Sequence, residues 1–158
     1  MREILFRGKP VNKAIYTNFE KKFKNASFFS NGFVFGSLVI YENKYYICLN
    51  IKLNMSGIIF NSNESNMTAT MIEVIPETVS QYIGLKDKKR NKIFEDDIIE
   101  RFWLGKKYIY RIDYDKYIAS FIGKDIYGLY FTTFDYDAYE FEIIGNIHDN
   151  PELLEEKE

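Results

Sequence analysis

The sequence has few of the residues on which metal sites and covalent cross-links depend. It contains one histidine, one cysteine and three prolines among its 158 residues. A single cysteine excludes an internal disulfide, so the composition gives no sign of an oxidising compartment. Cys48 lies in the apolar segment YYICLNI, and we expect it to be a small buried hydrophobic residue.

The sequence also lacks a long apolar run and a strong net charge. No hydrophobic stretch reaches the length that spans a membrane, and the N-terminal MREILFRGKP carries charges where a signal peptide would be hydrophobic. The net charge of −2 provides no whole-molecule attraction to nucleic acid or to an anionic membrane. We therefore expect a cytoplasmic protein with no membrane partner.

The charges are unevenly distributed along the chain. Residues 1–25 hold seven Lys or Arg against two Glu, whereas residues 135–158 hold nine Asp or Glu against one Lys. This asymmetry could steer a partner or draw the two ends together. A solvated surface with an acidic tail would show the same pattern, so both interpretations stay open.

Aromatic residues are abundant, with 13 Tyr and 14 Phe, and they favour strands, although an AT-rich genome would also supply them. The clearest strands are 33–41 and 44–52, whose separation by Glu42 and Asn43 predicts a hairpin with a two-residue turn. A further strand is expected in 68–75, ending at Pro76 because proline lacks the N–H that a sheet requires. The segment 54–67 is predicted to be a loop, and Phe19 with Phe23 predicts one amphipathic turn.

The second half of the chain predicts consecutive antiparallel strands. They lie in IFEDDIIERFWL and in 108–114, 117–123, 126–134 and 140–147, and the short gaps between them leave no room for helical crossovers. Five such strands could close into a small barrel without exposed edges. The segment Asp149–Leu154, with proline at an early position, predicts a short C-terminal helix.

Three separated blocks carry a resemblance to a known family. They are NGFVFGSL at Asn31–Leu38, VIPETVSQYIGLKDKKRNKIFEDDII at Val74–Ile99 and FEIIGNIHDNPELL at Phe141–Leu154. In this order and spacing they resemble the YopX family of small bacteriophage and prophage proteins, which has a recurring fold and no established activity. The chain departs from the family pattern at Arg90-Asn91, in place of Asn-Gly, and at Asp96, in place of glycine.

The resemblance implies that the C-terminal half is an SH3-like β-roll opened by Ile93–Arg101. We accordingly predict a mainly β protein with an N-terminal β lobe in residues 1–75 and an SH3-like antiparallel roll or barrel with a short terminal helix in residues 76–158, with one continuous domain as the alternative. If position 96 requires a positive φ, Asp is one of the few residues besides glycine that tolerates it. Within the opening strand, Ile98 and Phe102 share one face, and we expect that face to be the more buried.

The candidate catalytic groups are few. His148 leaves a Ser-His-Asp arrangement formally possible, but no nucleophile motif accompanies it. The Asp-x-Asp pairs at 113 and 115 and at 135 and 137, with Asp97, could hold Mg²⁺ if they converged. Solvated acids in turns are the more common explanation, so we predict no enzyme, no cofactor and no metal site.

The best candidate for nucleic-acid binding is a lysine-rich loop followed by a tryptophan. Small β-barrels can bind single strands by stacking bases on exposed aromatic rings beside a basic patch. A lysine-rich loop also serves solubility, which is the simpler explanation. The candidate residues are Lys86, Lys88, Lys89, Arg90, Lys92, Trp103, Lys106 and Lys107.

The sequence thus favours a non-enzymatic protein-interaction module of phage origin in the bacterial cytoplasm. We expect it to form homo-oligomers and to bind an unidentified phage or host protein, since aromatic strand edges are commonly paired across subunits. Binding of single-stranded nucleic acid through residues 86–92 is the alternative.

Overall fold

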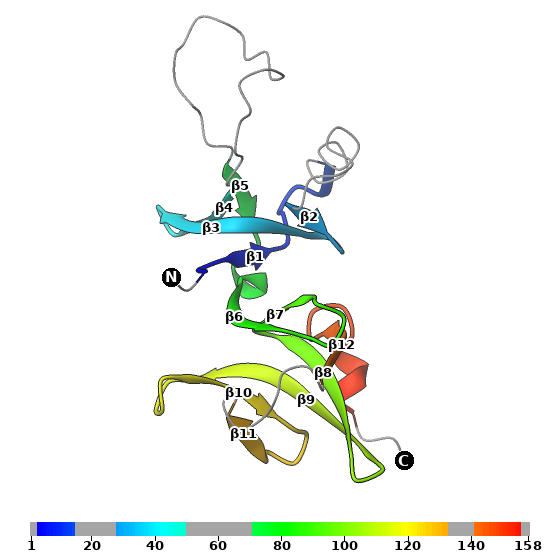
Figure 1. Cartoon of the computed structure of the whole chain (residues 1–158). Coiled ribbons are helices and arrows are strands. Elements are labelled where there is room, and N and C mark those ends of the chain that lie inside the picture. The colour runs from blue at the N-terminus through cyan, green and yellow to red at the C-terminus, as the bar shows by residue number, and fades with distance from the viewer. Residues whose placement is uncertain (1–2, 15–27, 50–70, 133–140, 156–158) are drawn as a thin grey trace, which may run out of the picture. The chain divides into compact units, whose positions relative to one another are not determined.

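The chain is mainly β, and its computed structural model describes residues 3–14, 28–49, 71–132 and 141–155 (Figure 1). These residues form antiparallel strands and two short 3-10 turns, η1 at Pro76–Thr78 and η3 at Pro151–Leu154. The chain divides into two compact units, Leu5–Val79 and Ser80–Glu158 together with Met1–Ile4. The predicted division into lobes at residues 1–75 and 76–158 stays a prediction.

The first unit is an antiparallel sheet with the order β5-β4-β3-β1, and β2 adds to the other end of β3. The predicted hairpin is confirmed, because β3 and β4 are joined by Glu42 and Asn43 with φ values of 47° and 61°. These values belong to the two-residue turn that suits the twist of a hairpin. The strands are β1 (Phe6–Gly8), β2 (Phe29–Ser30), β3 (Phe33–Tyr41), β4 (Lys44–Cys48) and β5 (Met71–Val74).

The core of this unit consists of aliphatic side chains from β3, β4 and β5, with Val34, Ile47 and Val74 almost fully buried. Cys48 is half-buried and not buried as predicted. It ends β4 opposite Met71, which is itself 53% exposed, so the core does not extend to this pair.

The second unit contains a five-stranded antiparallel sheet that curls into a half-barrel, with the order β11-β10-β9-β8-β12. The prediction of a closed barrel is not met, because no ladder joins β11 to β12 among the residues described. The last strand pairs with β8 instead. The strands are β8 (Asp97–Trp103), β9 (Lys106–Asp115), β10 (Ser120–Lys124), β11 (Tyr130–Thr132) and β12 (Glu142–Asn146).

A hairpin of β6 (Ser80–Lys86) and β7 (Lys92–Phe94) precedes the half-barrel and shares its core. Ile83 and Ile93 of the hairpin pack with Ile99, Ile112 and Phe121 of the sheet. Burial of these side chains supplies the main stabilising free energy of this unit, on the order of 2 kcal/mol for each.

The expectation that the face of Ile98 and Phe102 is the more buried one along β8 is wrong, because Ile99 and Arg101 on the opposite face are only 1% and 8% exposed. Ile98 is fully buried, but Phe102 on the same face is 63% exposed. The reason is the length of β12, which pairs with β8 only from Asp97 to Glu100 and leaves Phe102 in a two-stranded extension. A face that is covered at one end of a strand can therefore be open at the other.

The C-terminal helix is also corrected to the single 3-10 turn η3. Asn150 precedes this turn without a side-chain capping bond, and Glu155 returns to the extended conformation after four residues. Too few residues follow Pro151 in helical conformation to form an α-helical turn with stable hydrogen bonds. No helix among the described residues is long and apolar enough to cross a membrane.

The two departures from the family pattern both occupy left-handed backbone. Arg90 has a φ of 70° and Asp96 a φ of 65°, so the expectation of a positive φ at residue 96 is confirmed. The predictions for Phe19, Phe23, the loop 54–67 and the pair at 135 and 137 lie outside the described residues.

Candidate interaction surface

The lysine-rich loop between β6 and β7 is built on a buried carboxylate. Asp87 is fully buried and accepts hydrogen bonds from the backbone N–H of Lys89 at 2.9 Å and of Asn91 at 2.8 Å. The Asn91 side chain and the backbone N–H of Ile143 donate to its second oxygen, at 3.1 and 3.3 Å. Asp87 therefore fixes the loop and ties it to β12.

Most cations of the predicted basic patch are already paired within the fold. Lys88 and Lys89 both form ion pairs with Glu142 on β12, and Lys92 pairs with Glu3. Hydrogen bonds from the two lysines lower the pKa of Glu142 to about 2, and the bond to Glu142 raises the pKa of Lys89. A paired lysine has less to gain from a phosphate, because binding would first break the existing ion pair.

The structure divides the predicted nucleic-acid residues between two faces. Lys107 pairs with Glu100 at 2.6 Å, and Glu100 lies opposite Glu142 in the β8–β12 ladder, so Lys107 joins Lys88 and Lys89 around two glutamates. Trp103 and Lys106 are cross-strand partners on the opposite face of the β8–β9 hairpin. Arg90 is exposed in its turn and Lys86 is half-buried at the end of β6.

The Glu142 ion pairs predict a defined pH dependence of stability. The pKa of Glu142 in the folded chain lies below its ordinary value of 4.5, so its contribution is fully present above pH 4.5 and is lost as the pH falls toward about 2. Glu142→Gln should lower the urea midpoint at neutral pH, and this difference from the unsubstituted protein should shrink progressively below pH 4.5. A difference that stays constant from pH 7 to pH 2 would contradict the assignment.

The lone histidine does meet a serine and an aspartate, but not in the order of a catalytic triad. Asp96 lies between them, with Ser80 Oγ at 3.4 Å and His148 Nε2 at 3.4 Å from the same carboxylate oxygen. A triad instead places the histidine between the nucleophile and the acid. Arg111 also donates to Asp96 at 3.0 Å, and Ser80 is fully buried. The cluster therefore has a structural role, in which Asp96 links the side chains of Ser80, Arg111 and His148.

Three other acidic side chains accept hydrogen bonds from backbone N–H groups. Asp97 is buried and accepts from the N–H of Phe94, whereas Asp113 accepts from the N–H of the adjacent Tyr114. Burial raises the pKa of Glu95, which accepts from the N–H of Gln81. Within the described part of the chain, no group of His, Cys, Asp and Glu could hold a metal ion.

Sequence reasoning singled out Trp103 as an exposed aromatic residue but missed the other exposed apolar residues at the turns of the half-barrel. The β8–β9 turn exposes Phe102, Trp103 and Leu104 by 63%, 49% and 80%, and the β10–β11 turn exposes Tyr127 and Leu129. Both turns lie at one end of the sheet, because β9 runs antiparallel to β8 and to β10. The signal in the sequence was the apolar FWL directly before a turn glycine.

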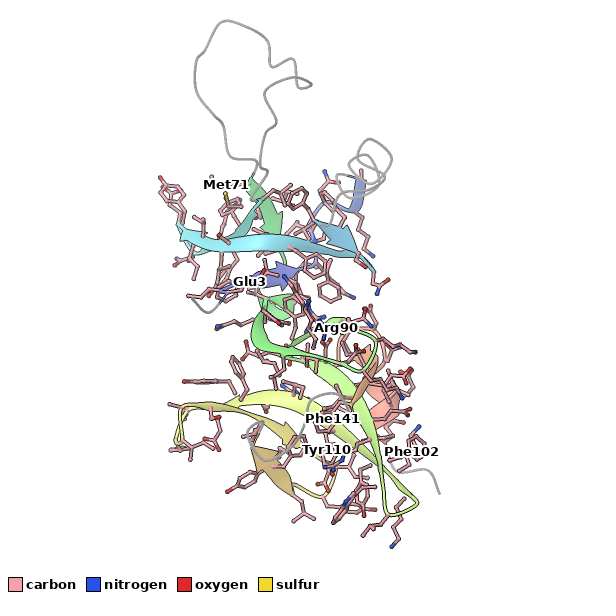
Figure 2. All side chains as sticks on the ribbon, in the orientation of Figure 1. Glu3, Met71, Arg90, Phe102, Tyr110 and Phe141 are labelled. Carbon is pink, nitrogen blue, oxygen red and sulfur yellow. The ribbon has the colours of Figure 1, made fainter. Side chains whose placement is uncertain are left out.

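An aromatic row crosses the inner face of the half-barrel from this end to the core. Successive ring centroids are 6.4 Å apart from Trp103 to Tyr108, 6.3 Å from Tyr108 to Tyr110, 4.7 Å from Tyr110 to Phe131 and 5.3 Å from Phe131 to Phe141. Figure 2 labels Tyr110 and Phe141 on this path, with Phe102 at the open end. The row fixes the exposed β8–β9 turn to the core.

These features define a mainly β protein whose half-barrel displays an apolar end and holds its basic loop in ion pairs. The chain belongs to the YopX family, because the family model described as YopX protein matches residues 37–155. Protein EF1440 from Enterococcus faecalis is similar in part, with 29% identity over 54% of this chain and 69% of that chain, and a TM-score of 0.32. No curated protein matches the sequence.

Proposed function

We propose that this protein is a non-enzymatic interaction module that self-associates, acting as a phage-encoded accessory protein in the cytoplasm of a bacterial host. The proposal rests on one observation, that β11 ends the sheet order of the half-barrel among the described residues and begins at an exposed aromatic residue. Tyr130, the first residue of β11, is 62% exposed, and Leu129 in the turn directly before it is 69% exposed. Strands at the end of a sheet pair readily with another chain unless charge or proline protects them.

A second copy could continue the half-barrel through β11. In a two-fold arrangement β11 of one copy would pair with β11 of the other, which would bury Leu129 and Tyr130 of both copies at once. A phage or host protein that offers a strand could occupy the same edge.

The test is the molar mass in solution, measured by size-exclusion chromatography with light scattering. We expect a mass above that of the monomer which rises with concentration. Tyr130→Lys should return it to the monomer value, because a lysine on an outer strand opposes pairing. Tyr41→Lys is the matched control, since Tyr41 is 63% exposed at a turn of the other unit. A monomer mass at every concentration would reject self-association.

Single-stranded nucleic-acid binding is the weaker candidate. The loop that would carry it has Lys88 and Lys89 paired with Glu142, and Lys92 with Glu3. Salt-dependent binding of an oligonucleotide that is lost when Lys88, Lys89 and Arg90 are replaced by Glu would favour this candidate instead.

A further inference from the structure

We propose that the end of the β8–β9 hairpin is a docking wedge for an anionic lipid surface. The wedge consists of Phe102, Trp103 and Leu104 at the turn, with Lys106 and Lys107 at its base. This inference is independent of self-association through β11, and it departs from the expectation of no membrane partner.

The turn breaks two local rules at one residue. Leu104 and Gly105 have φ values of 47° and 74°, which is the two-residue turn that favours Asn-Gly. A leucine in left-handed backbone is strained, and this leucine is also 80% exposed. The same type of turn between β3 and β4 carries the polar residues Glu42 and Asn43. An exposed apolar residue in strained backbone indicates that its side chain contacts a binding partner.

The direction of the three apolar side chains favours a fluid partner. Phe102 and Trp103 are consecutive in a strand and point to opposite faces, and Leu104 occupies the turn between them and β9. A flat protein surface would contact only one of these faces. The interfacial layer of a bilayer can surround all three, and tryptophan is enriched at that depth.

Cations stand on both faces at the base of the wedge. Lys106 lies opposite Trp103 and Lys107 lies opposite Phe102, so each face pairs an aromatic ring with a lysine. Lys107 is largely neutralised by its ion pair with Glu100, so the positive charge offered to headgroups comes mainly from the exposed Lys106. Lysines in this position attract anionic headgroups while their aliphatic stems extend along the apolar surface.

The neighbouring β10–β11 turn adds to the same end of the half-barrel. It carries Tyr127, which is 73% exposed, and Ile126, which is 41% exposed, after the exposed Lys124. Asp125 follows Lys124, so this turn adds apolar area without net positive charge, and it lies farther back along β9 than the wedge because Lys124 pairs with Arg111.

The test uses Trp103, the only tryptophan in the sequence, as a built-in probe. Vesicles of phosphatidylcholine and phosphatidylglycerol in equal amounts should shift its emission to the blue, and brominated acyl chains should quench it. Vesicles of phosphatidylcholine alone should act more weakly. Leu104→Asp should reduce vesicle affinity about tenfold or more, since it removes the apolar tip and adds a repelled charge.

Folding controls separate loss of docking from loss of structure. Aspartate tolerates positive φ better than leucine, so Leu104→Asp should not lower the unfolding midpoint. Lys106→Gln should weaken binding to the anionic vesicles about fivefold. Tyr117→Asp is the matched control, because Tyr117 is 87% exposed in the β9–β10 turn at the opposite end of the sheet.

Three results would overturn the proposal. One is Trp103 emission that does not change with anionic vesicles. A second is a blue shift that requires only a higher protein concentration, which would assign the wedge to a second copy. The third is a response to single-stranded oligonucleotides and not to vesicles, which would assign it to nucleic acid.

Discussion

Asp87→Ala is expected to lower the free energy of unfolding by about 3 kcal/mol, because it removes a fully buried carboxylate that accepts four hydrogen bonds. The carboxylate is fully buried and accepts from two groups of Asn91 and from the N–H groups of Lys89 and Ile143. Asp87→Asn should cost less, since its remaining oxygen can still accept from two of the four donors. Urea unfolding followed by Trp103 fluorescence measures both variants.

Asp115→Ala provides the control for this prediction. Asp115 is also a turn aspartate, but it is half-buried and accepts from the N–H of Tyr117 at the surface. Its loss should cost about 1 kcal/mol or less, because water can replace the carboxylate. Equal losses at Asp87 and Asp115 would show that burial of the acceptor does not govern the stability of these turns.

Gly36→Ala is expected to destabilise the first unit by about 3 kcal/mol, through overpacking between two strands. A Cβ at residue 36 would lie 2.8 Å from the carbonyl carbon of Cys48 and closer still to its oxygen. The obstacle is backbone, which cannot rotate away as a side chain would. The β3–β4 ladder must therefore separate at Ser37 and Cys48 to admit the methyl group.

The measurement for Gly36→Ala is amide hydrogen exchange of β3 and β4, together with the thermal midpoint by circular dichroism. Protection in both strands should fall. Gly32→Asn is the matched control, because Gly32 has a φ of 79° and open space around it, and asparagine tolerates this backbone. Unchanged protection in Gly36→Ala would mean that the strands already have room for a Cβ.

The local features of the fold could be predicted from the sequence, and the non-local ones could not. Glu42 and Asn43 indicated their turn because two residues between β-rich runs permit few geometries. The half-closed sheet depends on which strand β12 joins, and alternation within a strand carries no information about its neighbour. The same limit explains the error at Phe102, since burial there depends on where β12 ends.

The ion pairs of the basic loop are likewise non-local and could not be predicted from the sequence. Five cations within residues 86–92 are visible in the sequence, but the acid that holds two of them is Glu142, more than fifty residues away. The apolar turn at Leu104 was visible as FWL before a glycine, and its significance depended on knowing that Leu104 is 80% exposed.

The pairing of β12 with β8 gives the half-barrel a dependence on the order of synthesis. The strands β8 to β11 leave the ribosome first, yet β8 keeps one edge open until residues 142–146 follow. Until then β8 lacks its partner strand at Ile98 and Ile99, and Asp87 lacks the N–H of Ile143. Such an intermediate exposes apolar surface to chaperones and proteases. A chain that ends before residue 142 would lack one partner strand of β8, and we expect it to be more sensitive to proteolysis than the full chain.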